Sequence, residues 1–563
     1  MAKLSQHHAG LAGHYEVVVV GSGYGGGIAA SRMARAGREV CVLERGRELQ
    51  PGEYPNDPIT LLAHTQTDLP LAHVGSPSAL LDLRYNPDIN VVVGCGLGGT
   101  SLINSGASAR ADPRVFQDPA WPAEIRAEAA LERYYALAEA MLKPVPYPDQ
   151  APRLAKLDAL ERSAQALGAP FYRIPVHTTF EALPGGVNHV GVPQQPCVGC
   201  GDCESGCNYG AKNTVLMNYL PDAARHGARI YSEIAVRSLA RDGHGWKLLC
   251  RRLDAGAPDR DIEIRADRVI LGAGSLGSTE ILLRSAAAGL ALSPALGTRF
   301  SGNGDLIGFS YNCDVEVNSV GCGPFAPDPD HPPGPCVAGV VDARGGRALD
   351  EGLMMECGGV PGAIGGWMPL VLSAAAKLLG EDTDRGLRDA LREATRALES
   401  KLGGPYVGAI RNTQTYITVA HDDSGGRMYL DADRLRIDWP GVGGQPHFAR
   451  AAAMMRAATA ALGGTFVANP TWNRLTNQQL LTGHPLGGCP MADDAARGVV
   501  DHRGRVYAGS SGSAVHEGLY VMDAAIIPRS LGVNPLLVIC ALAERACAHL
   551  AAAQGWPLGY EFS

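Results

Sequence analysis

The chain has 563 residues, of which 46% are hydrophobic and 19% are charged, and its formal net charge is -8. This length exceeds what one ordinary core holds, so we expect two structural regions with room for a buried pocket. The negative charge offers nucleic acid no attraction, so we expect no nucleic-acid partner. Residues Met1 to His14 lack a basic stretch followed by an apolar run, so we expect a cytoplasmic protein that is not exported.

The chain begins with a pattern typical of a strand, a tight turn and a helix. The apolar run Tyr15–Val20 enters a glycine-rich turn, and good helix formers follow at residues 28–36. The turn has the motif Gly21-x-Gly23-x-x-Gly26. Such glycines let the backbone approach a pyrophosphate, whose charge then lies at the helix N-terminus. Glu44 ends the next apolar run, roughly 20 residues on, where a carboxylate suits a ribose diol.

Two further glycine clusters imitate this turn. They are Gly94-Cys95-Gly96-Leu97-Gly98-Gly99 and Gly272-Ala273-Gly274-Ser275-Leu276-Gly277. The second has the same motif, but residues 292–295, about 20 positions on, include no acidic residue for a ribose. We therefore expect no separate nicotinamide site. These glycines either line one long dinucleotide with the first cluster or only allow close packing.

Four of the 14 cysteines form the run Cys197-x-x-Cys200-x-x-Cys203-x-x-x-Cys207. This is the spacing of bacterial ferredoxins, and it predicts one iron–sulfur cluster, of the 4Fe-4S or 3Fe-4S type. Zinc sites usually combine two cysteine pairs roughly a dozen or more residues apart, and unligated thiols in a reducing compartment are the other alternative. Asn208 replaces the ferredoxin proline, and the fourth cysteine of two-cluster ferredoxins serves another cluster, so a remote ligand stays open.

The middle of the chain predicts a substrate region. Residues 321–335 are rich in turn formers, and Tyr416–Val419 is typical of a strand. Residues 368–402 predict one or two amphipathic helices, whose leucines either pack in the core, the ordinary outcome, or form a lid or a membrane-touching rim. These leucines are Leu370, Leu372, Leu378, Leu379, Leu387, Leu391 and Leu398. Glu356, in an apolar strand-like run, either lines the substrate cavity or faces solvent.

Three motifs near the carboxyl end complete a recognisable order. They are His484-Pro485-Leu486-Gly487-Gly488-Cys489, Leu519-Tyr520-Val521-Met522-Asp523 and Gly532-Val533-Asn534-Pro535. With the glycine clusters, they resemble the glucose-methanol-choline (GMC) family of flavoproteins over most of the chain. Many members carry a second histidine where this chain has Asn534. With an asparagine at this position, the chain resembles the cholesterol oxidase-like branch of the family. Some members of that branch have the cysteine run and others lack it.

The resemblance implies that the chain binds FAD. Glu44 would lie at the adenosine, Val236 would contact the adenine through its backbone, and Asp523 would lie near the pyrophosphate or the ribityl chain. The full set of implied cofactor residues is Gly21, Gly23, Gly26, Glu44, Gly94, Gly98, Gly99, Ser101, Asn104, Val236, Gly274, Asp523, Asn534 and Pro535.

The resemblance also implies the reaction. His484 and Asn534 would face the flavin ring, where His484 handles the hydroxyl proton while the CH–OH carbon gives a hydride to flavin N5. Asn534 would fix the alcohol oxygen without adding charge, and Pro535 restrains the backbone before it. The expected substrate is a hydrophobic alcohol, such as a sterol or a long-chain alcohol. Glu356 would be catalytic if the enzyme also isomerises a double bond, as cholesterol oxidases do with a buried glutamate.

The alternative functions differ in the electron acceptor that they require. With an iron–sulfur cluster, electrons would leave the flavin for an external electron carrier, and the enzyme would be a dehydrogenase. A cholesterol oxidase/isomerase would instead use O2 and Glu356. The third alternative is a protein that only relays electrons between flavin and cluster. In such a protein His484 and Asn534 would have no role.

The expected fold is of the α/β class. It combines a Rossmann-like FAD-binding domain with an interwoven substrate domain built on an antiparallel sheet plus helices. By the resemblance, the FAD-binding domain is discontinuous and takes residues 14–60, 90–115, 196–310 and 475–563. The substrate domain takes residues 61–89, 116–195 and 311–474.

Overall fold

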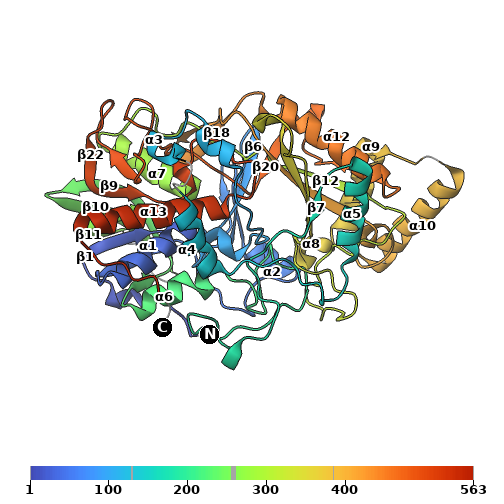
Figure 1. Ribbon diagram of the computed structural model, residues 1–563, viewed down its shortest axis with the longest axis horizontal. Coiled ribbons are helices and arrows are strands. Elements are labelled where there is room, and N and C mark those ends of the chain that lie inside the picture. Colours follow the sequence, from blue (N-terminus) through green and yellow to red (C-terminus); the bar gives the residue numbers. More distant parts are fainter. Residues whose placement is uncertain (1, 128–130, 255–260, 385, 562–563) are drawn as a thin grey trace.

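Strand β1 (His14–Val20) lies inside an eight-stranded sheet on the left of Figure 1. The structure, a computed structural model, describes residues 2–127, 131–254, 261–384 and 386–561. The valines of β1 are buried on both faces of the strand, as expected inside a parallel sheet. β1 pairs in parallel with two neighbours, β2 (Val40–Leu43) and β11 (Asp261–Leu271). The other strands are β8 (Arg229–Tyr231), β9 (Ile234–Asp242), β10 (Gly245–Arg252), β21 (Arg505–Tyr507) and β22 (Val515–Val521).

Helix α1 (Tyr24–Arg35) packs against α6 (Tyr219–Arg225) and α13 (Leu536–Gln554) beside this sheet (Figure 1). Arg32 of α1 donates two hydrogen bonds of 2.7 Å to the buried carboxylate of Glu544 on α13. Because a buried charge needs a partner, this ion pair fixes how the two helices meet. α13 is long and apolar enough to cross a membrane, but 72% of its apolar window is buried, so it is a core helix.

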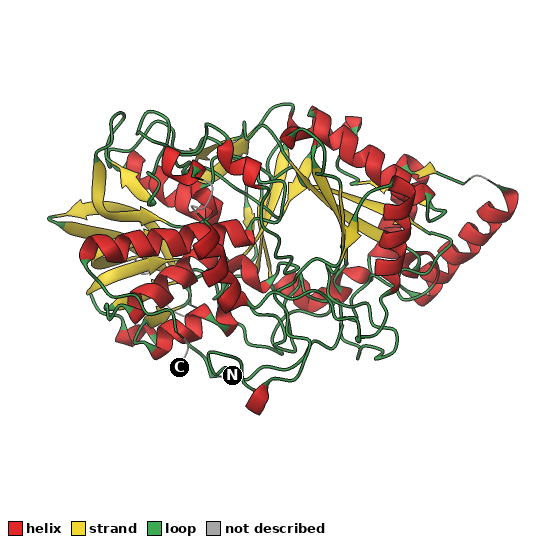
Figure 2. Cartoon of the chain, in the orientation of Figure 1, coloured by secondary structure: helices red, strands yellow, loops and turns green. Residues whose placement is uncertain are grey.

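The second sheet has seven strands, and all of its pairings are antiparallel. Helices α5 (Ala155–Leu167) and α12 (Pro446–Ala460) contact it on the right of Figure 2. In spatial order its strands are β15 (Glu381–Asp382), β19 (Thr465–Ala468), β12 (Leu306–Tyr311), β16 (Gln414–Ala420), β14 (Leu353–Gly358), β13 (Val340–Asp342) and β7 (Phe171–Tyr172). The predicted α/β class with a separate antiparallel sheet is therefore confirmed.

The third sheet draws strands from both expected domains. Its order is β20 (Leu480–Thr482), β6 (Ile89–Gly94), β5 (Leu81–Arg84), β3 (Thr65–Asp68) and β4 (His73–Val74). In addition, β12 begins at Leu306, inside the range 196–310 expected for the cofactor domain, yet belongs to the antiparallel sheet. The further elements are the hairpin β17 (Arg427–Asp431) and β18 (Arg434–Asp438), with helices α2 (Pro58–Ala63), α3 (Ala123–Arg126), α4 (Glu132–Leu142), α7 (Gly274–Ala287), α8 (Gly362–Gly365) and α11 (Gly408–Arg411).

The predicted helical stretch 368–402 forms two helices, α9 (Met368–Leu379) and α10 (Leu387–Gly403), and residue 385 between them lies outside the described residues. The expectation that their leucines pack in the core is wrong for most of them. Leu372 is buried and Leu379 is 41% exposed, whereas five others are between 57% and 89% exposed. These five are Leu370, Leu378, Leu387, Leu391 and Leu398. Figure 1 shows α10 projecting from the right end of the molecule.

Candidate active site

The three glycine clusters meet at the N-terminus of α1. A Cβ on Gly21 would lie 2.6 Å from the carbonyl oxygen of Gly272, and a Cβ on Gly99 would lie 2.8 Å from the Cα of Gly23. Both positions also have a positive φ, so glycine is required twice over. No side chain caps the N-terminus of α1, so its N–H groups remain open to an anion. The residues therefore fit the pyrophosphate of a dinucleotide.

Glu44 lies beside this turn, and its carboxylate is held in place. It accepts hydrogen bonds from the N–H (3.0 Å) and the hydroxyl (2.6 Å) of Ser22 and from the N–H of Gly46 (2.7 Å). The N–H of Ile234, which begins β9, donates to the carbonyl oxygen of Glu44 at 2.8 Å. Val236, two residues further along β9, is therefore close in the fold to Glu44. This is the arrangement expected at the two ends of an adenosine.

The turn between Gly94 and Asn104 packs on α1. The amide nitrogen of Asn104 donates to the hydroxyl of Tyr24 at 2.7 Å, while its Oδ1 is buried without a partner among the described residues. Ser101 donates to the carbonyl oxygen of Gly98 at 2.6 Å and so closes the turn. An unpaired buried amide oxygen is costly, so a ligand group is expected to meet it.

Asp523 connects the third glycine cluster to the carboxyl-terminal segment. Its carboxylate accepts from the N–H of Gly274 (2.9 Å), the hydroxyl of Ser278 (2.5 Å) and the N–H of Ala525 (2.8 Å). Burial raises the pKa of Asp523 to about 6. Its carboxylate is thus bound to the backbone at the start of α7, next to the space around the open end of α1.

Two of the three predicted catalytic residues are in direct contact, and the third is electrostatically coupled to them. The amide nitrogen of Asn534 lies 3.4 Å from a carboxylate oxygen of Glu356, and both side chains are buried. The side-chain oxygen of Asn534, Oδ1, and the second carboxylate oxygen of Glu356, Oε1, have no partner among the described residues. Burial raises the pKa of Glu356 to about 7, while the neighbouring His484 opposes this rise. The alternative in which Glu356 faces solvent is therefore excluded.

Asp305, which the sequence did not single out, orients His484. The Nδ1 atom of His484 lies 2.9 Å from a carboxylate oxygen of Asp305. The second oxygen of that carboxylate accepts from the hydroxyl of Thr482 at 2.7 Å. This contact occupies Nδ1 and leaves Nε2 as the ring atom that can meet a substrate. Burial lowers the pKa of His484, but attraction to Asp305 outweighs it, so the pKa is raised.

Asn303, two residues earlier, holds the segment that carries Asn534. Its side chain accepts from the N–H of Leu531 (2.8 Å) and donates to the carbonyl oxygen of Val533 (2.9 Å). Asn303 is fully buried and has a φ of 58°, a conformation that asparagine tolerates better than most residues. The loop that precedes β12 therefore positions both His484 and Asn534.

Asp305→Asn is expected to lower the rate of flavin reduction by about 10- to 100-fold, less than loss of the histidine itself would. The substitution removes the charge that raises the pKa of His484, so His484 becomes neutral at lower pH. The acidic limb of the pH profile of kcat/KM should therefore move to lower pH while the plateau falls. Anaerobic stopped-flow measurements across pH would check both effects, and an unmoved acidic limb would contradict the role of Asp305.

The four cysteines of the run line one small cavity together with Lys212 and Tyr209. All four are free and partly exposed. Among the described residues no three cysteine sulfurs lie within 4.8 Å of one another. Four thiolates around one zinc ion at about 2.3 Å would lie closer together than this. The sulfurs are therefore too widely spaced, as they stand, for a single zinc ion.

Two buried lysines flank these cysteines. Lys212 donates to the carbonyl oxygens of Leu102 (2.9 Å), Asn104 (2.7 Å) and Cys203 (2.9 Å), so it ties the Gly94–Asn104 turn to the cysteine run. Lys156 on α5 donates to the carbonyl oxygens of the adjacent residues Pro335 and Cys336. Among the described residues neither ammonium group forms an ion pair with a carboxylate. Burial lowers the pKa of Lys212.

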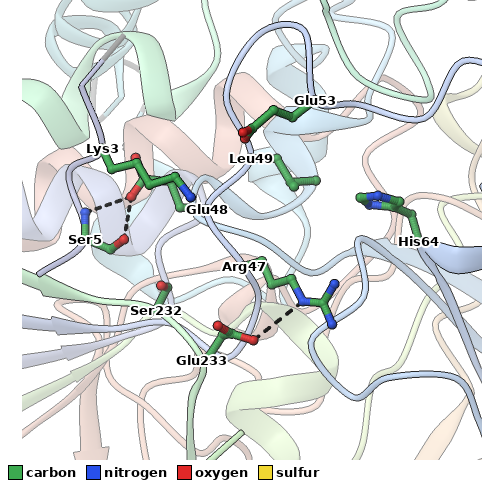
Figure 3. A pocket seen from close by; sticks show the side chains of 9 residues that line it. All are labelled: Lys3, Ser5, Arg47, Glu48, Leu49, Glu53, His64, Ser232 and Glu233. Atoms are coloured by element: carbon green, nitrogen blue, oxygen red, sulfur yellow. Dashed lines mark hydrogen bonds and ion pairs between the residues drawn. The ribbon is translucent and has the colours of Figure 1, made fainter. Parts of the chain in front are cut away.

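A separate pocket of about 320 Å³ contains none of the predicted site residues (Figure 3). Its polar groups largely satisfy one another. Glu48 accepts from the N–H of Ser5 at 2.7 Å, and Arg47 lies 3.5 Å from Glu233. The lining residues are Lys3, Ser5, Arg47, Glu48, Leu49, Glu53, His64, Ser232 and Glu233. We assign no catalytic role to this pocket.

A glycine-lined helix N-terminus after the parallel strand β1, together with a partly exposed histidine and a buried asparagine and glutamate, is the arrangement of a dinucleotide-binding oxidoreductase. The family models of GMC oxidoreductases match residues 17–302 and 377–543. The chain therefore belongs to the GMC oxidoreductase family, whose members bind FAD, and it is a flavoprotein oxidoreductase.

Some of its relatives are named for the alcohols that they oxidise. A cholesterol oxidase of Mycobacterium tuberculosis is 28% identical over 94% of this chain and 90% of the relative. A cholesterol oxidase of Acinetobacter baumannii is 24% identical over 96% and 94%. A long-chain-alcohol oxidase of Arabidopsis thaliana is 24% identical over 93% of this chain and 65% of the plant protein.

Solved structures agree on the fold. A pyridoxine 4-oxidase from Mesorbium loti superposes with a TM-score of 0.60 at 16% identity, over 96% of this chain and 99% of that one. A fungal aryl-alcohol oxidase gives 0.58 at 16% identity, over 97% and 100%. At this identity the likeness concerns the fold alone.

Proposed function

We propose that this protein oxidises a lipophilic alcohol, a sterol or a long-chain alcohol, with FAD as the hydride acceptor. The observation that carries this proposal is the contact between the amide nitrogen of Asn534 and one carboxylate oxygen of Glu356, which leaves Oδ1 of Asn534 and Oε1 of Glu356 unpaired among the described residues. His484 is electrostatically coupled to the same carboxylate. Buried polar atoms of this kind are expected to meet a polar ligand group. The relatives named for cholesterol and long-chain alcohols support a lipophilic substrate.

Each residue of the site has a separate role in the proposed reaction. Nε2 of His484 accepts the hydroxyl proton, and Asp305 stabilises the resulting imidazolium from the far side of the ring. Asn534 orients the alcohol oxygen, and Asn303 keeps its segment in place. When bound, FAD supplies the hydride acceptor.

Anaerobic addition of the alcohol to the purified enzyme tests the proposal. Reduction of the flavin should bleach its absorbance at about 450 nm. A panel of sterols, straight-chain alcohols of increasing length and short polar alcohols would identify the class. Bleaching by short polar alcohols alone would contradict the lipophilic substrate, and no bleaching by any alcohol would contradict the reaction.

We also propose that the cysteine run holds an iron–sulfur cluster that passes electrons to an external carrier. Two buried ammonium groups that form no ion pair with a carboxylate among the described residues, Lys156 and Lys212, support it, because buried cations need a compensating charge and only the carboxyl of Glu204 interacts with both. A cluster bound by four thiolates carries net negative charge and supplies it. The wide spacing of the sulfurs also suits a multi-iron cluster better than one zinc ion. Iron and sulfide analysis of anaerobically purified protein tests this.

Double-bond isomerisation is a second candidate function, because Glu356 is buried and burial raises its pKa to about 7. A carboxylate with that pKa can both accept and return a proton near neutral pH. In Glu356→Gln we expect the flavin still to be reduced by a sterol while the conjugated product disappears. Product analysis by ultraviolet absorbance would check this, and conjugated product at the wild-type rate would exclude the role.

We further propose that the protein is cytoplasmic. We also propose that the exposed leucines of α9 and α10 contact a lipid surface. Lipophilic alcohols dissolve in bilayers, and an exposed apolar stripe can enter the interface. The protein should sediment with phosphatidylcholine vesicles, and the double variant Leu387→Ser/Leu391→Ser should lose most of this binding. Leu475→Ser, which changes an even more exposed leucine outside α9 and α10, is the control. Equal sedimentation of all three proteins would contradict the contact.

A further inference from the structure

Asp422 lies two residues after strand β16, is buried, and joins the turn after that strand to the loop before β12. Both of its carboxylate oxygens accept from the hydroxyl of Ser301, at 2.7 and 2.9 Å. Its Oδ2 also accepts from the N–H of Gly304 at 3.0 Å, and its Oδ1 accepts from the N–H of Ser424 at 3.0 Å. The turn and the loop therefore meet at one carboxylate.

The two donors from the loop lie next to residues of the candidate active site. Gly304 lies between Asn303 and Asp305 in the chain. The hydroxyl of Ser301 accepts from the N–H of Asn303 at 2.9 Å. Asp305 in turn contacts Nδ1 of His484. The buried carboxylate is therefore connected to the histidine through one short stretch of backbone.

The same turn also holds the start of the segment that carries Asn534. The N–H of Ser530 donates to the hydroxyl of Ser424 at 3.0 Å. The hydroxyl of Ser530, which is fully buried, donates to the carbonyl oxygen of Asp422 at 3.0 Å. Asp422 therefore touches both segments that shape the site, the loop before β12 through its side chain and the other segment through its backbone.

The carboxylate of Asp422 meets neutral hydrogen-bond donors. Burial raises the pKa of Asp422 to about 6, and the charge of Asp423 adds to the rise. Hydrogen bonds from Ser301, Gly304 and Ser424 oppose it. At neutral pH the group is therefore a carboxylate, which only accepts hydrogen bonds. An amide of the same shape accepts with one oxygen only, and its NH2 group would face donors.

We infer that Asp422 is a positioning residue whose carboxylate holds the loop 301–305 and thereby keeps Asp305 against His484. The inference rests on the function proposed above for this site. Hydrogen bonds to an ionised acceptor are roughly twice as strong as those between neutral groups, so the carboxylate fixes the loop more firmly than an amide does. Without it, the loop is free to shift and the contact between Asp305 and His484 weakens.

The pKa of His484 in the holoenzyme tests the inference without any substrate. In protein isotope-labelled at the histidine Cε1 atom, the NMR signal of His484 is the one that His484→Gln removes. Among the carboxyl groups of Asp305, Glu356 and Glu204, that of Asp305 raises this pKa most. In Asp422→Asn we expect the pKa to fall by about one unit, the smaller end of the effect of a nearby opposite charge. The FAD content should equal that of the wild type.

Two further variants separate positioning from general loss of stability. Asp501 is similarly buried and holds another turn, where it accepts from the N–H groups of Arg503 and Arg505 at 2.9 Å. Asp501→Asn should therefore lower Tm without changing the pKa of His484. The double variant Asp305→Asn/Asp422→Asn should show the same pKa as Asp305→Asn alone, because both changes act through one contact.

The outcomes distinguish this inference from the proposed function. An unchanged pKa of His484 in Asp422→Asn would overturn the inference, and so would a double variant whose pKa lies below that of Asp305→Asn. If Asp422→Asn does not fold, Ser301→Ala decides: it removes one donor to the carboxylate, so the pKa should fall by less, and no fall would overturn the inference. A lowered pKa in an enzyme whose flavin no alcohol reduces would support the positioning role and contradict the proposed function.

Discussion

His484→Gln is expected to slow reduction of the flavin by an alcohol by about 10²- to 10⁴-fold. Glutamine keeps a polar side chain of similar reach, but it cannot accept a proton near neutral pH. The hydroxyl proton would then have to leave to Glu356 or to water. Anaerobic stopped-flow absorbance at saturating alcohol measures the rate directly, without any dependence on the electron acceptor.

His14→Gln is the matched control, because it changes a half-exposed histidine far along the chain from the site. It should reduce its flavin at the wild-type rate. Binding of FAD should survive in both variants, because His484 contacts Asp305 rather than the glycine clusters. If the His484→Gln variant reduces its flavin as fast as the wild type, His484 is not the proton acceptor.

Cys200→Ser is expected to abolish the iron–sulfur cluster while leaving flavin reduction intact. Cys200 lines the cavity of the run, and a serine oxygen is a poor ligand for iron in such clusters. Iron and sulfide should fall to background, and reduction of a one-electron carrier should stop. The alcohol should still bleach the flavin, because the His484 site does not depend on the thiol.

Cys322→Ser is the control for this experiment. Cys322 is bonded through its backbone to Cys200 but does not line the cavity, so its thiol should be dispensable. Full iron content in the Cys200→Ser variant would show that the run does not hold the metal. Full carrier reduction by an iron-free variant would show that electrons leave the flavin by another route.

The sequence predicted the parts of this molecule that depend on local backbone geometry. Gly21 and Gly99 were found because a close approach with a positive φ demands glycine, and that demand is visible in a single turn. His484 and Asn534 were found because their motifs resemble those of a family, and in the structure both adjoin the same buried glutamate. The assignment of domain ranges and of most cofactor contacts stays a prediction.

The sequence missed residues whose roles depend on contacts between distant segments. Asp305 meets His484 from 179 positions away, and nothing around Asp305 resembles a motif. Lys156 and Lys212 look like ordinary surface lysines in the sequence, and only the packing buries them. The leucines of α10 were expected in the core but are exposed. Helical periodicity shows that one face of a helix is apolar, but it does not show whether another element covers that face.

The loop before β12 has a consequence for redesign of the enzyme. Asn303 and Asp305 lie on the same short stretch, and they set the positions of Asn534 and His484 respectively. Any change that shifts this stretch to admit a bulkier alcohol would therefore misplace the proton acceptor at the same time.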